Sequence, residues 1–213
     1  MAPVSLPDVE RGRRLPPDER REQILRCASE LFAARPYTEV SVSEIARTAG
    51  VARGLVNHYF GDKRGIYLEI LRRAVLLPVL EDAVPAGQLD GVPLERRVEL
   101  AVSWFLDSVE PHAASYFTIL GAGGVAEDPE VARILDEGDD LAARRTLELL
   151  GLDAERSTSR AAVRAYGGMA KATVREWVRT GALTREQAHA LLRDVLMAVV
   201  ATIEAEASGH GSR

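Results

Sequence analysis

The segment from Pro36 to Ile70 constrains the fold of this chain more than any other part of it. It reads PYTEVSVSEIARTAGVARGLVNHYFGDKRGIYLEI. Ser41 and Glu44 form an S-x-x-E capping box, which predicts the start of a helix. Gly50 predicts its end, because glycine readily adopts the left-handed conformation of a helix C-terminus. A second short helix is predicted from Ala52 to Phe60. Two short helices joined by a glycine turn indicate a helix-turn-helix.

The second of these helices has an apolar side and a polar side. Val56 and Phe60 are four residues apart and are predicted to face inward, with Leu55 or Tyr59 at the margin. The residues left facing outward are Arg53, Gly54, Asn57 and His58. Arginine and asparagine can each make two hydrogen bonds to a base edge in the major groove, so this face is predicted to read DNA.

The residues that flank this helix are predicted to contact the DNA backbone. Asp62 is expected to cap the next helix, and Lys63 at its start would offer an ammonium and a positive helix terminus to a phosphate. Tyr59 could donate its hydroxyl to another phosphate. The complete set of predicted DNA-binding residues is Ser41, Ser43, Arg53, Gly54, Asn57, His58, Tyr59 and Lys63.

Helical spacing of apolar residues continues through the rest of the chain, and strand alternation is almost absent. With three helices in the N-terminal region, further helices predicted at 65–81, 93–109, 113–120, 128–150, 154–180 and 184–207 give an all-α fold of about nine helices. Residues 121–124 are predicted to be a flexible linker rather than a phosphate loop, because no strand is predicted before them and no Gly-Lys-Ser/Thr follows. The predicted organisation is a flexible basic arm (1–17), a helix-turn-helix domain (18–66), and a connecting helix with a helical bundle (67–213).

Composition and motifs argue against several classes of protein. No run approaches the roughly 18 apolar residues of a membrane span, and the N-terminus lacks the apolar segment of a secretory signal, so the chain is expected to be cytoplasmic, without a membrane partner. Cys27 is the only cysteine, which excludes an intrachain disulfide and a cysteine-rich zinc site. Without an H-E-x-x-H, a nucleophile elbow or a metal-spaced cluster, no enzyme activity, metal or cofactor is predicted.

Charge is unevenly distributed along the chain. Residues 1–75 hold 13 Lys and Arg against 10 Asp and Glu, whereas residues 76–213 hold 14 against 22. The basic excess lies with the predicted DNA-reading part, as expected when one end of a protein meets phosphates. Arg11, Arg13 and Arg14 lie in a Pro-rich, aperiodic segment, which is either a solvated tail or an arm for the adjacent minor groove.

Residues 20–72 resemble the N-terminal domain of TetR-family (tetracycline-repressor-like) transcriptional regulators. The resemblance rests on the combination S-V-x-x-I-A-x-x-A-G-V-x-x-G-x-V-x-x-Y-F-x-x-K. It implies an all-α homodimer with two DNA-binding heads, each joined to a C-terminal helical ligand-binding and dimerisation bundle. It also implies, in most members, repression that a small molecule relieves.

Three residues depart from the family pattern. Pro36 stands where the family commonly has glycine, and proline cannot adopt the positive φ of a glycine cap, so the chain must turn differently there. Ala52 replaces the serine that often caps the recognition helix, which forfeits about 1 kcal/mol. Asn57 stands where an aromatic residue is common, so the operator sequence cannot be transferred from relatives.

The last two long helices are predicted to form a dimer interface. The apolar stripe on 184–207 is too wide for one neighbour, and the resemblance implies a four-helix bundle made of the last two helices of each subunit. Two heads about 34–36 Å apart would require a palindromic double-stranded DNA operator. Gly167 and Gly168 lie inside the first of these helices, where close approach of another helix, or a bend, would account for them.

The aromatic residues of the C-terminal region admit two interpretations: they line an apolar cavity with a few polar anchors, or they are simply the core of the bundle. The predicted ligand contacts are Trp104, Phe105, His112, Tyr116, Phe117, Leu120, Tyr166, Met169 and Trp177. The favoured function is a sequence-specific repressor whose operator binding a small apolar or amphipathic ligand relieves. The alternatives are a ligand-independent dimer controlled by a protein partner and, as a weaker rival, a helical enzyme.

Overall fold

Helices make up all the regular structure of the residues described by the computed structural model, which are 16–81, 89, 91–110 and 128–210. The α-helices in these ranges are α1 (Pro17–Ala34), α2 (Val42–Thr48), α3 (Arg53–Phe60), α4 (Lys63–Glu81), α5 (Leu94–Val109), α7 (Pro129–Leu150), α8 (Ser157–Val174) and α9 (Arg185–His210). The predicted all-α fold is therefore confirmed. The predicted helix at 113–120 and the linker at 121–124 lie outside the described residues.

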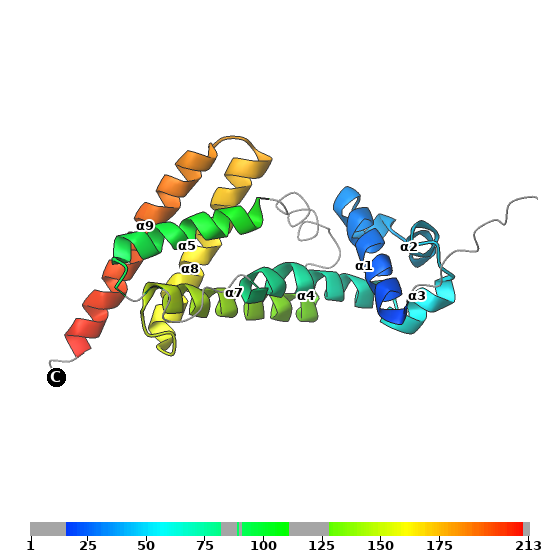
Figure 1. Ribbon diagram of the computed structural model, residues 1–213, viewed down its shortest axis with the longest axis horizontal. Coiled ribbons are helices and arrows are strands. Elements are labelled where there is room, and N and C mark those ends of the chain that lie inside the picture. The colour runs from blue at the N-terminus through cyan, green and yellow to red at the C-terminus, as the bar shows by residue number, and fades with distance from the viewer. Residues whose placement is uncertain (1–15, 82–88, 90, 111–127, 211–213) are drawn as a thin grey trace, which may run out of the picture.

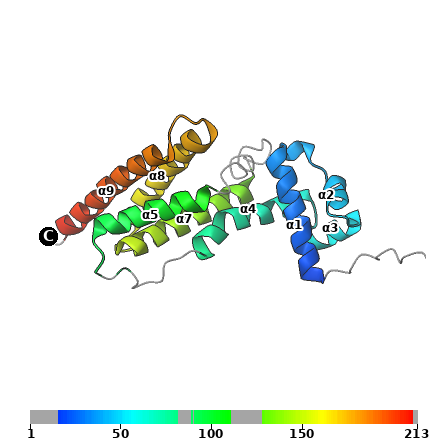
Figure 2. The same cartoon turned by 45° about the horizontal axis from the view of Figure 1, so that its top comes forward.

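The helices form two groups joined by a pair of long helices. Figure 1 shows α1, α2 and α3 gathered at one end of the molecule and α8 and α9 at the other. Between them α4 and α7 pack against each other, and the turned view in Figure 2 shows the same arrangement. We call α1–α3 with the first turns of α4 the head, and α5, α7, α8 and α9 the body.

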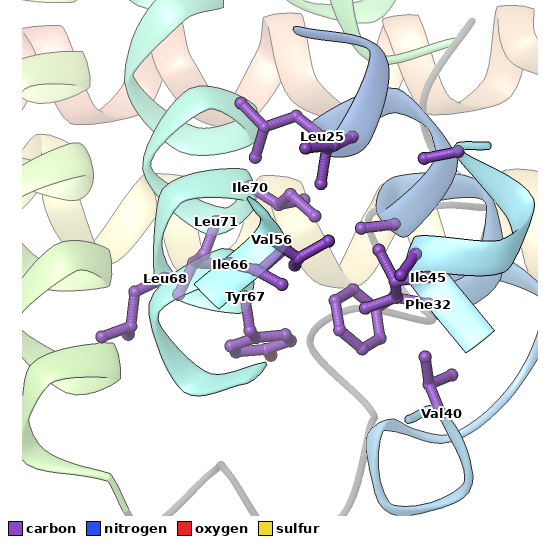
Figure 3. Close-up of a cluster of buried hydrophobic side chains, with 14 of the residues drawn as sticks. Leu25, Phe32, Val40, Ile45, Val56, Ile66, Tyr67, Leu68, Ile70 and Leu71 are labelled. Carbon is purple, nitrogen blue, oxygen red and sulfur yellow. The ribbon is translucent and has the colours of Figure 1, made fainter. Parts of the chain in front are cut away.

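The head has a continuous apolar core, which Figure 3 shows in close-up. Phe32 of α1, Ile45 of α2 and Ile66 of α4 are fully buried in it, and Val56 of α3 is 1% exposed. Burying such side chains stabilises a fold by about 1.5–3 kcal/mol each. The whole cluster comprises Ile24, Leu25, Ala28, Phe32, Val40, Ile45, Ala46, Ala49, Val56, Ile66, Tyr67, Leu68, Ile70, Leu71, Val131 and Ile134. Its last two members belong to α7, so the body completes the core of the head.

Close packing and ion pairs join α4 to α7. A methyl group on Gly138 of α7 would lie 2.1 Å from Cγ1 of Val75, so glycine is what allows the two helices to approach there. At the start of α4, Arg64 Nε donates to Asp128 Oδ2 at 2.6 Å and its Nη2 donates to Oδ1 at 2.8 Å. One helix therefore links the head to the body through both apolar and charged contacts.

The predicted capping box at Ser41 and a second box at Thr184 form to different extents. Ser41 Oγ accepts a hydrogen bond from the Glu44 amide at 3.2 Å, but the Glu44 carboxylate pairs with Arg35 instead of reaching back. At the start of α9 the box is reciprocal: the Thr184 amide donates to Gln187 Oε1 at 2.9 Å, and the Gln187 amide donates to Thr184 Oγ1 at 3.2 Å. Both predicted helix starts are confirmed, and only the first box is incomplete.

The corner after α1 turns without a left-handed residue, as the proline requires. Arg35 is extended, with φ −146° and ψ 154°, and Pro36 follows with φ −52°. A 3-10 turn at Tyr37–Glu39 follows, and Val40 then connects it to Ser41, the N-cap of α2. The predicted departure from a glycine cap is therefore confirmed.

The body has its own core between α5, α8 and α9. Val98 and Leu106 of α5, Val174 of α8, and Leu192 and Leu196 of α9 are buried in one cluster. A π-helical turn at Arg175–Arg179 ends α8. Within the described ranges, no helix is both long and apolar enough to cross a membrane.

Gly167 and Gly168 correct one packing prediction. A methyl group on either glycine would meet no atom of the described residues within 4 Å, so none of the helices described here approaches them closely. Both lie inside the continuous helix α8. Packing against the described helices of the same subunit therefore does not explain these residues.

Candidate DNA-binding surface

The turn between α2 and α3 fixes the angle between the two helices of the reading unit. Gly50 has φ +63°, a conformation that glycine adopts without steric cost. The Val51 amide donates to the Ala46 carbonyl at 2.9 Å, which closes the turn, and the half-buried Val51 side chain packs on the head core. This is the helix-turn-helix geometry that the sequence predicts.

One face of α3 is anchored in the core and the opposite face is open. Val56 is 1% exposed, and Phe60 is half-buried with the Arg21 guanidinium 5.1 Å from its ring centroid. The exposed residues of the helix are Arg53, Gly54, Asn57 and His58, as the helical spacing predicts.

The polar groups on this open face are available to another molecule. Within the described part of the chain, neither Arg53 nor the side-chain amide of Asn57 has a hydrogen-bond or ion-pair partner. A methyl group on Gly54 would also meet nothing within 4 Å. The face therefore carries unpaired donors and an acceptor around a site where a DNA edge could approach the backbone closely.

The N-terminus of α3 lacks a side-chain cap, as Ala52 predicts. Ala52 has φ −69° and ψ 141°, and no side chain bonds the first amides of the helix. These amides point along the helix axis toward solvent, where the helix dipole favours an anion.

Helix α2 presents a second set of polar groups. Ser41 and Ser43 are both exposed, and Ser41 caps the helix. Arg47 is not among the predicted DNA-binding residues, although its side chain is 80% exposed one turn beyond Ser43. The four-residue interval between Ser43 and Arg47 was the available signal, because residues four apart share a helix face.

Tyr59 lies at the edge of the surface, as predicted. Its side chain is half-buried, and its ring lies 5.5 Å from that of His58 and 6.1 Å from that of Phe60, measured between centroids. The ring therefore borders both the core and the exposed face.

The ammonium of Lys63, which the sequence suggested as a phosphate contact, is bonded to the backbone of the head. Its Nζ donates to the carbonyls of Tyr37 at 2.8 Å and Val40 at 2.9 Å, and lies 4.1 Å from the centroid of the Tyr37 ring. Burial lowers the pKa of this ammonium. Asp62 does cap α4 as expected, because its Oδ1 accepts from the Gly65 amide at 2.8 Å. Of these two residues, the lysine alone lies otherwise than expected, with two of its donors bonded to carbonyls of the head.

Eight of the nine predicted ligand contacts fall into two groups, and the ninth, Trp104, is half-buried on α5. His112, Tyr116, Phe117 and Leu120 lie outside the described residues. Packed against the body core are Phe105, Tyr166, Met169 and Trp177, all half-buried. The structure brings these four together around one core, which suits either of the two interpretations drawn from the sequence.

Two polar atoms among these aromatic residues differ in their environment. Tyr166 donates its hydroxyl to the Leu192 carbonyl at 3.2 Å, and burial raises the pKa of that hydroxyl. Trp104 Nε1 is buried but has no hydrogen-bond partner in the described part of the chain. Within the ranges that the structure describes, there is no group of three or more His, Cys, Asp or Glu side chains that could hold a metal ion.

Comparison with known proteins decides which family these features represent. Residues 24–70 match the model of the bacterial regulatory proteins of the tetR family, and residues 94–199 match the tetracyclin repressor-like C-terminal domain. The transcriptional activator FasR of Mycolicibacterium smegmatis is 32% identical over 157 residues, which are 74% of this chain and 70% of that protein. This chain belongs to the TetR family. It is a DNA-binding transcriptional regulator of a family that is not enzymatic.

Further relatives and solved structures agree with this assignment. The regulator HbdR of Aromatoleum is 38% identical over 81 residues, which are 37% of this chain and 34% of that protein. A TetR-family regulator from Streptomyces coelicolor has a TM-score of 0.74 at 25% identity, with 93% of this chain and 87% of that one covered. NalD of Pseudomonas aeruginosa shares the fold, with a TM-score of 0.64 at 21% identity over 86% of this chain and 98% of that one.

Proposed function

We propose that this TetR-family regulator represses transcription by occupying a palindromic operator as a homodimer, and that a small apolar or amphipathic ligand releases it. FasR is named an activator and NalD a secondary repressor, so relatives and structural neighbours act in both directions. Repression requires only that the protein cover its operator, whereas activation also requires a contact with the transcription machinery. Because the protein would act on operator DNA, its proposed location is the cytoplasm.

The exposed, unpaired face of α3 is the observation that carries the DNA-reading part of the proposal. Arg53 and Asn57 lie one turn apart on that face, and Val56 between them holds the helix in the core. A helix presented in this way fits the major groove, where arginine pairs with guanine and asparagine with adenine.

Arg53→Met tests this reading against an arginine of the body. We expect it to weaken operator binding by roughly tenfold or more, since a bidentate base contact contributes about 1–3 kcal/mol of discrimination. Arg96→Met is the matched control, because the Arg96 side chain is 62% exposed on α5 and, among the described residues, pairs only with Glu99 of its own helix. Equal operator affinities for the two variants would refute the assignment of α3 as the reading helix.

Small and apolar residues on α8 and α9 support the proposed dimer. Ala161, Ala165, Gly168 and Ala172 form an exposed small-residue row on α8. On α9, Leu191 is 41% exposed although it is a large apolar residue, and the neighbouring buried stripe packs on the body core of the same chain. A second copy would cover both faces and would also account for the unoccupied space beside Gly167 and Gly168.

Sedimentation of Gly168→Leu and Leu191→Glu tests the dimer. We expect a wild-type dimer at micromolar concentration and a shift of both variants toward monomer, because each places bulk or charge in the proposed interface. Helical structure should be retained, since both positions are exposed and a methyl group on Gly168 would meet no described atom within 4 Å. A monomeric wild-type protein would overturn the proposal.

The aromatic group of the body supports the proposed ligand. The buried indole N–H of Trp104 has no partner among the described residues, so a polar atom of a ligand could accept its hydrogen bond. The half-buried rings of Phe105, Tyr166 and Trp177 offer apolar area. The chain contains two tryptophans, Trp104 and Trp177, so ligand binding there should change the intrinsic fluorescence.

A thermal-shift screen with fluorescence as a second readout tests the ligand. A compound at 100 times its dissociation constant should add about 2.7 kcal/mol of stability. It should also shift the tryptophan emission and lower operator affinity. Binding that leaves operator affinity unchanged would contradict release by a ligand, and silence across broad apolar and cationic libraries would favour control by a protein partner.

A further inference from the structure

We propose that Lys63 is a positioning residue for the DNA-reading unit: its ammonium binds the backbone that leads into α2 and so fixes that helix to the start of α4. The proposal rests on the proposed operator reading by α2 and α3. It assigns to Lys63 an internal role in place of a contact with DNA.

The two carbonyls that bind Lys63 lie immediately before α2. Tyr37 and Val40 bound the 3-10 turn, and Val40 directly precedes Ser41, the N-cap of α2. The Tyr37 carbonyl accepts from both Lys63 Nζ at 2.8 Å and the Val40 amide at 3.3 Å, so the lysine strengthens the turn at its closing point. The Val40 carbonyl accepts from Nζ at 2.9 Å. A charged donor forms the stronger class of hydrogen bond.

Aromatic contacts also hold this turn. The Tyr37 ring stacks on Phe32 of α1 with 5.7 Å between centroids and meets Tyr67 of α4 edge-on at 5.1 Å. Lys63 and Tyr67 are one turn apart on α4, so the same helix contacts the turn twice. The buried rings of Phe32 and Tyr67 lie beside each other in Figure 3.

The surroundings of Lys63 disfavour a phosphate contact. Two of its three N–H groups are used by carbonyls, and the remaining space around Nζ includes the face of the Tyr37 ring at 4.1 Å. The cation supplies a donor to the Val40 carbonyl, which lies just before Ser41, the residue whose own carbonyl accepts the first backbone hydrogen bonds of α2. Ser41, Ser43 and the α2 axis are therefore oriented by a side chain of the connecting helix.

Three possible roles of Lys63 predict different effects on DNA binding and stability when the lysine is replaced. A phosphate contact raises affinity for every DNA sequence, and its loss lowers the slope of log affinity against log salt by about 0.9. A positioning residue leaves the slope unchanged but is needed for the operator more than for other DNA, because only base reading depends on the orientation of α2 and α3. A purely structural residue changes stability and leaves the affinity of the folded protein unchanged.

The experiment compares Lys63→Met, Lys63→Arg and Arg53→Met in the full-length protein. Affinities for the operator and for unrelated duplex DNA are measured at several salt concentrations, at a temperature where circular dichroism shows every variant folded. We expect Lys63→Met to lose roughly tenfold in operator affinity while its affinity for unrelated DNA and its salt slope stay as in wild type. Lys63→Arg should recover part of the loss, because guanidinium also donates to carbonyls. Arg53→Met serves as the comparison for removing an exposed cation.

Hydrogen exchange of the head, measured without DNA, separates the proposal from the proposed function. The amides of Val40 and Glu44 should exchange faster in Lys63→Met than in wild type, and the Gly61 amide at the end of α3 should be unaffected.

If wild type prefers no DNA sequence, the function proposal fails, and unchanged exchange in Lys63→Met independently overturns the role of the lysine. Equal loss on both DNAs with a slope lowered by about 0.9 would establish the phosphate contact instead. Operator affinity unchanged in folded Lys63→Met would show a purely structural residue. If Lys63→Met does not fold, Lys63→Gln takes its place, with the same outcomes.

Discussion

At the scale of single residues, base reading depends on the contrast between adjacent positions of α3. Val56 is 1% exposed in the head core, whereas Asn57, the next residue, is exposed with its amide unpaired in the described part of the chain. A side-chain amide has donors and an acceptor, which match N6 and N7 of adenine in the major groove. Asn57 is therefore the residue most able to distinguish one base pair from another by hydrogen bonds.

Asn57→Ala should relax the base preference at one position of each half-site. The discrimination lost should be about 1–3 kcal/mol at that position, with the remaining positions unchanged, because the helix stays anchored by Val56. Binding profiles against an operator randomised one position at a time measure this directly. Identical profiles for Asn57→Ala and wild type would show that Asn57 does not contact a base.

Periodicity predicts which side of a helix is buried, but it cannot predict contacts between distant residues. The exposure of Arg53 and Asn57 followed from the spacing of Val56 and Phe60, and the structure confirms it. The contacts of Lys63 span 23 and 26 residues, so nothing in its neighbourhood along the chain indicates them. The open surroundings of Gly167 were likewise hidden, since the residue type alone does not say what packs against it.

At the scale of elements, α3 is short and is held by its surroundings more than by its own sequence. It has eight residues and no side-chain cap, and isolated helices of this length are marginal in water. Capping residues mark the starts of α2, α4, α7 and α9, because the hydroxyl or carboxylate that bonds the first amides lies within three residues of them. Glu44 is the exception: Arg35, nine residues away, takes its carboxylate.

Ala52→Ser should stabilise the start of α3. A serine at this position can accept a hydrogen bond from an amide of the first turn, which contributes about 1 kcal/mol to the free energy of unfolding. Urea unfolding of wild type and Ala52→Ser measures the difference. Ala34→Ser, at the exposed C-terminal residue of α1, provides the control and should bring no gain. A variant no more stable than wild type would mean that the first amides of α3 are already satisfied by solvent at no cost.

At the scale of the whole molecule, the head is not independent of the body. Val131 and Ile134 of α7 complete the head core, and Val75 of α4 lies against Gly138. Arg64 and Asp128 add a two-bond ion pair at the start of both helices. The sequence predicted the two parts and the connecting helix, but their shared core depends on which faces of α4 and α7 meet, and that is set by tertiary packing.

The ion pair between Arg64 and Asp128 should make the junction sensitive to acid. Arg64 lowers the pKa of Asp128 to about 2. The pKa of an aspartate in the unfolded chain is about 3.9. The contribution of the ion pair to stability is therefore complete above that pH and is lost as the pH falls through about 2. Between pH 5 and pH 2.5, the stability of wild type should fall more steeply than that of Asp128→Asn.

Asp128→Asn isolates the charge, because asparagine caps a helix about as well as aspartate. Arg64→Gln should lower the melting temperature at neutral pH by a similar amount, and the double variant should lose little more than either single one. Thermal unfolding across this pH range measures all three. Additive losses, or losses that do not change with pH, would contradict a functional pairing of the two residues.

Selection of binding sites from randomised duplex DNA by the full-length protein tests the central claim most directly. The account predicts enrichment of a palindrome whose half-sites are about 10–10.5 base pairs apart, or a multiple of that, because two symmetric heads would each place α3 in a major groove. Recovery of no enriched sequence, or of a single half-site bound by a monomer, would contradict it.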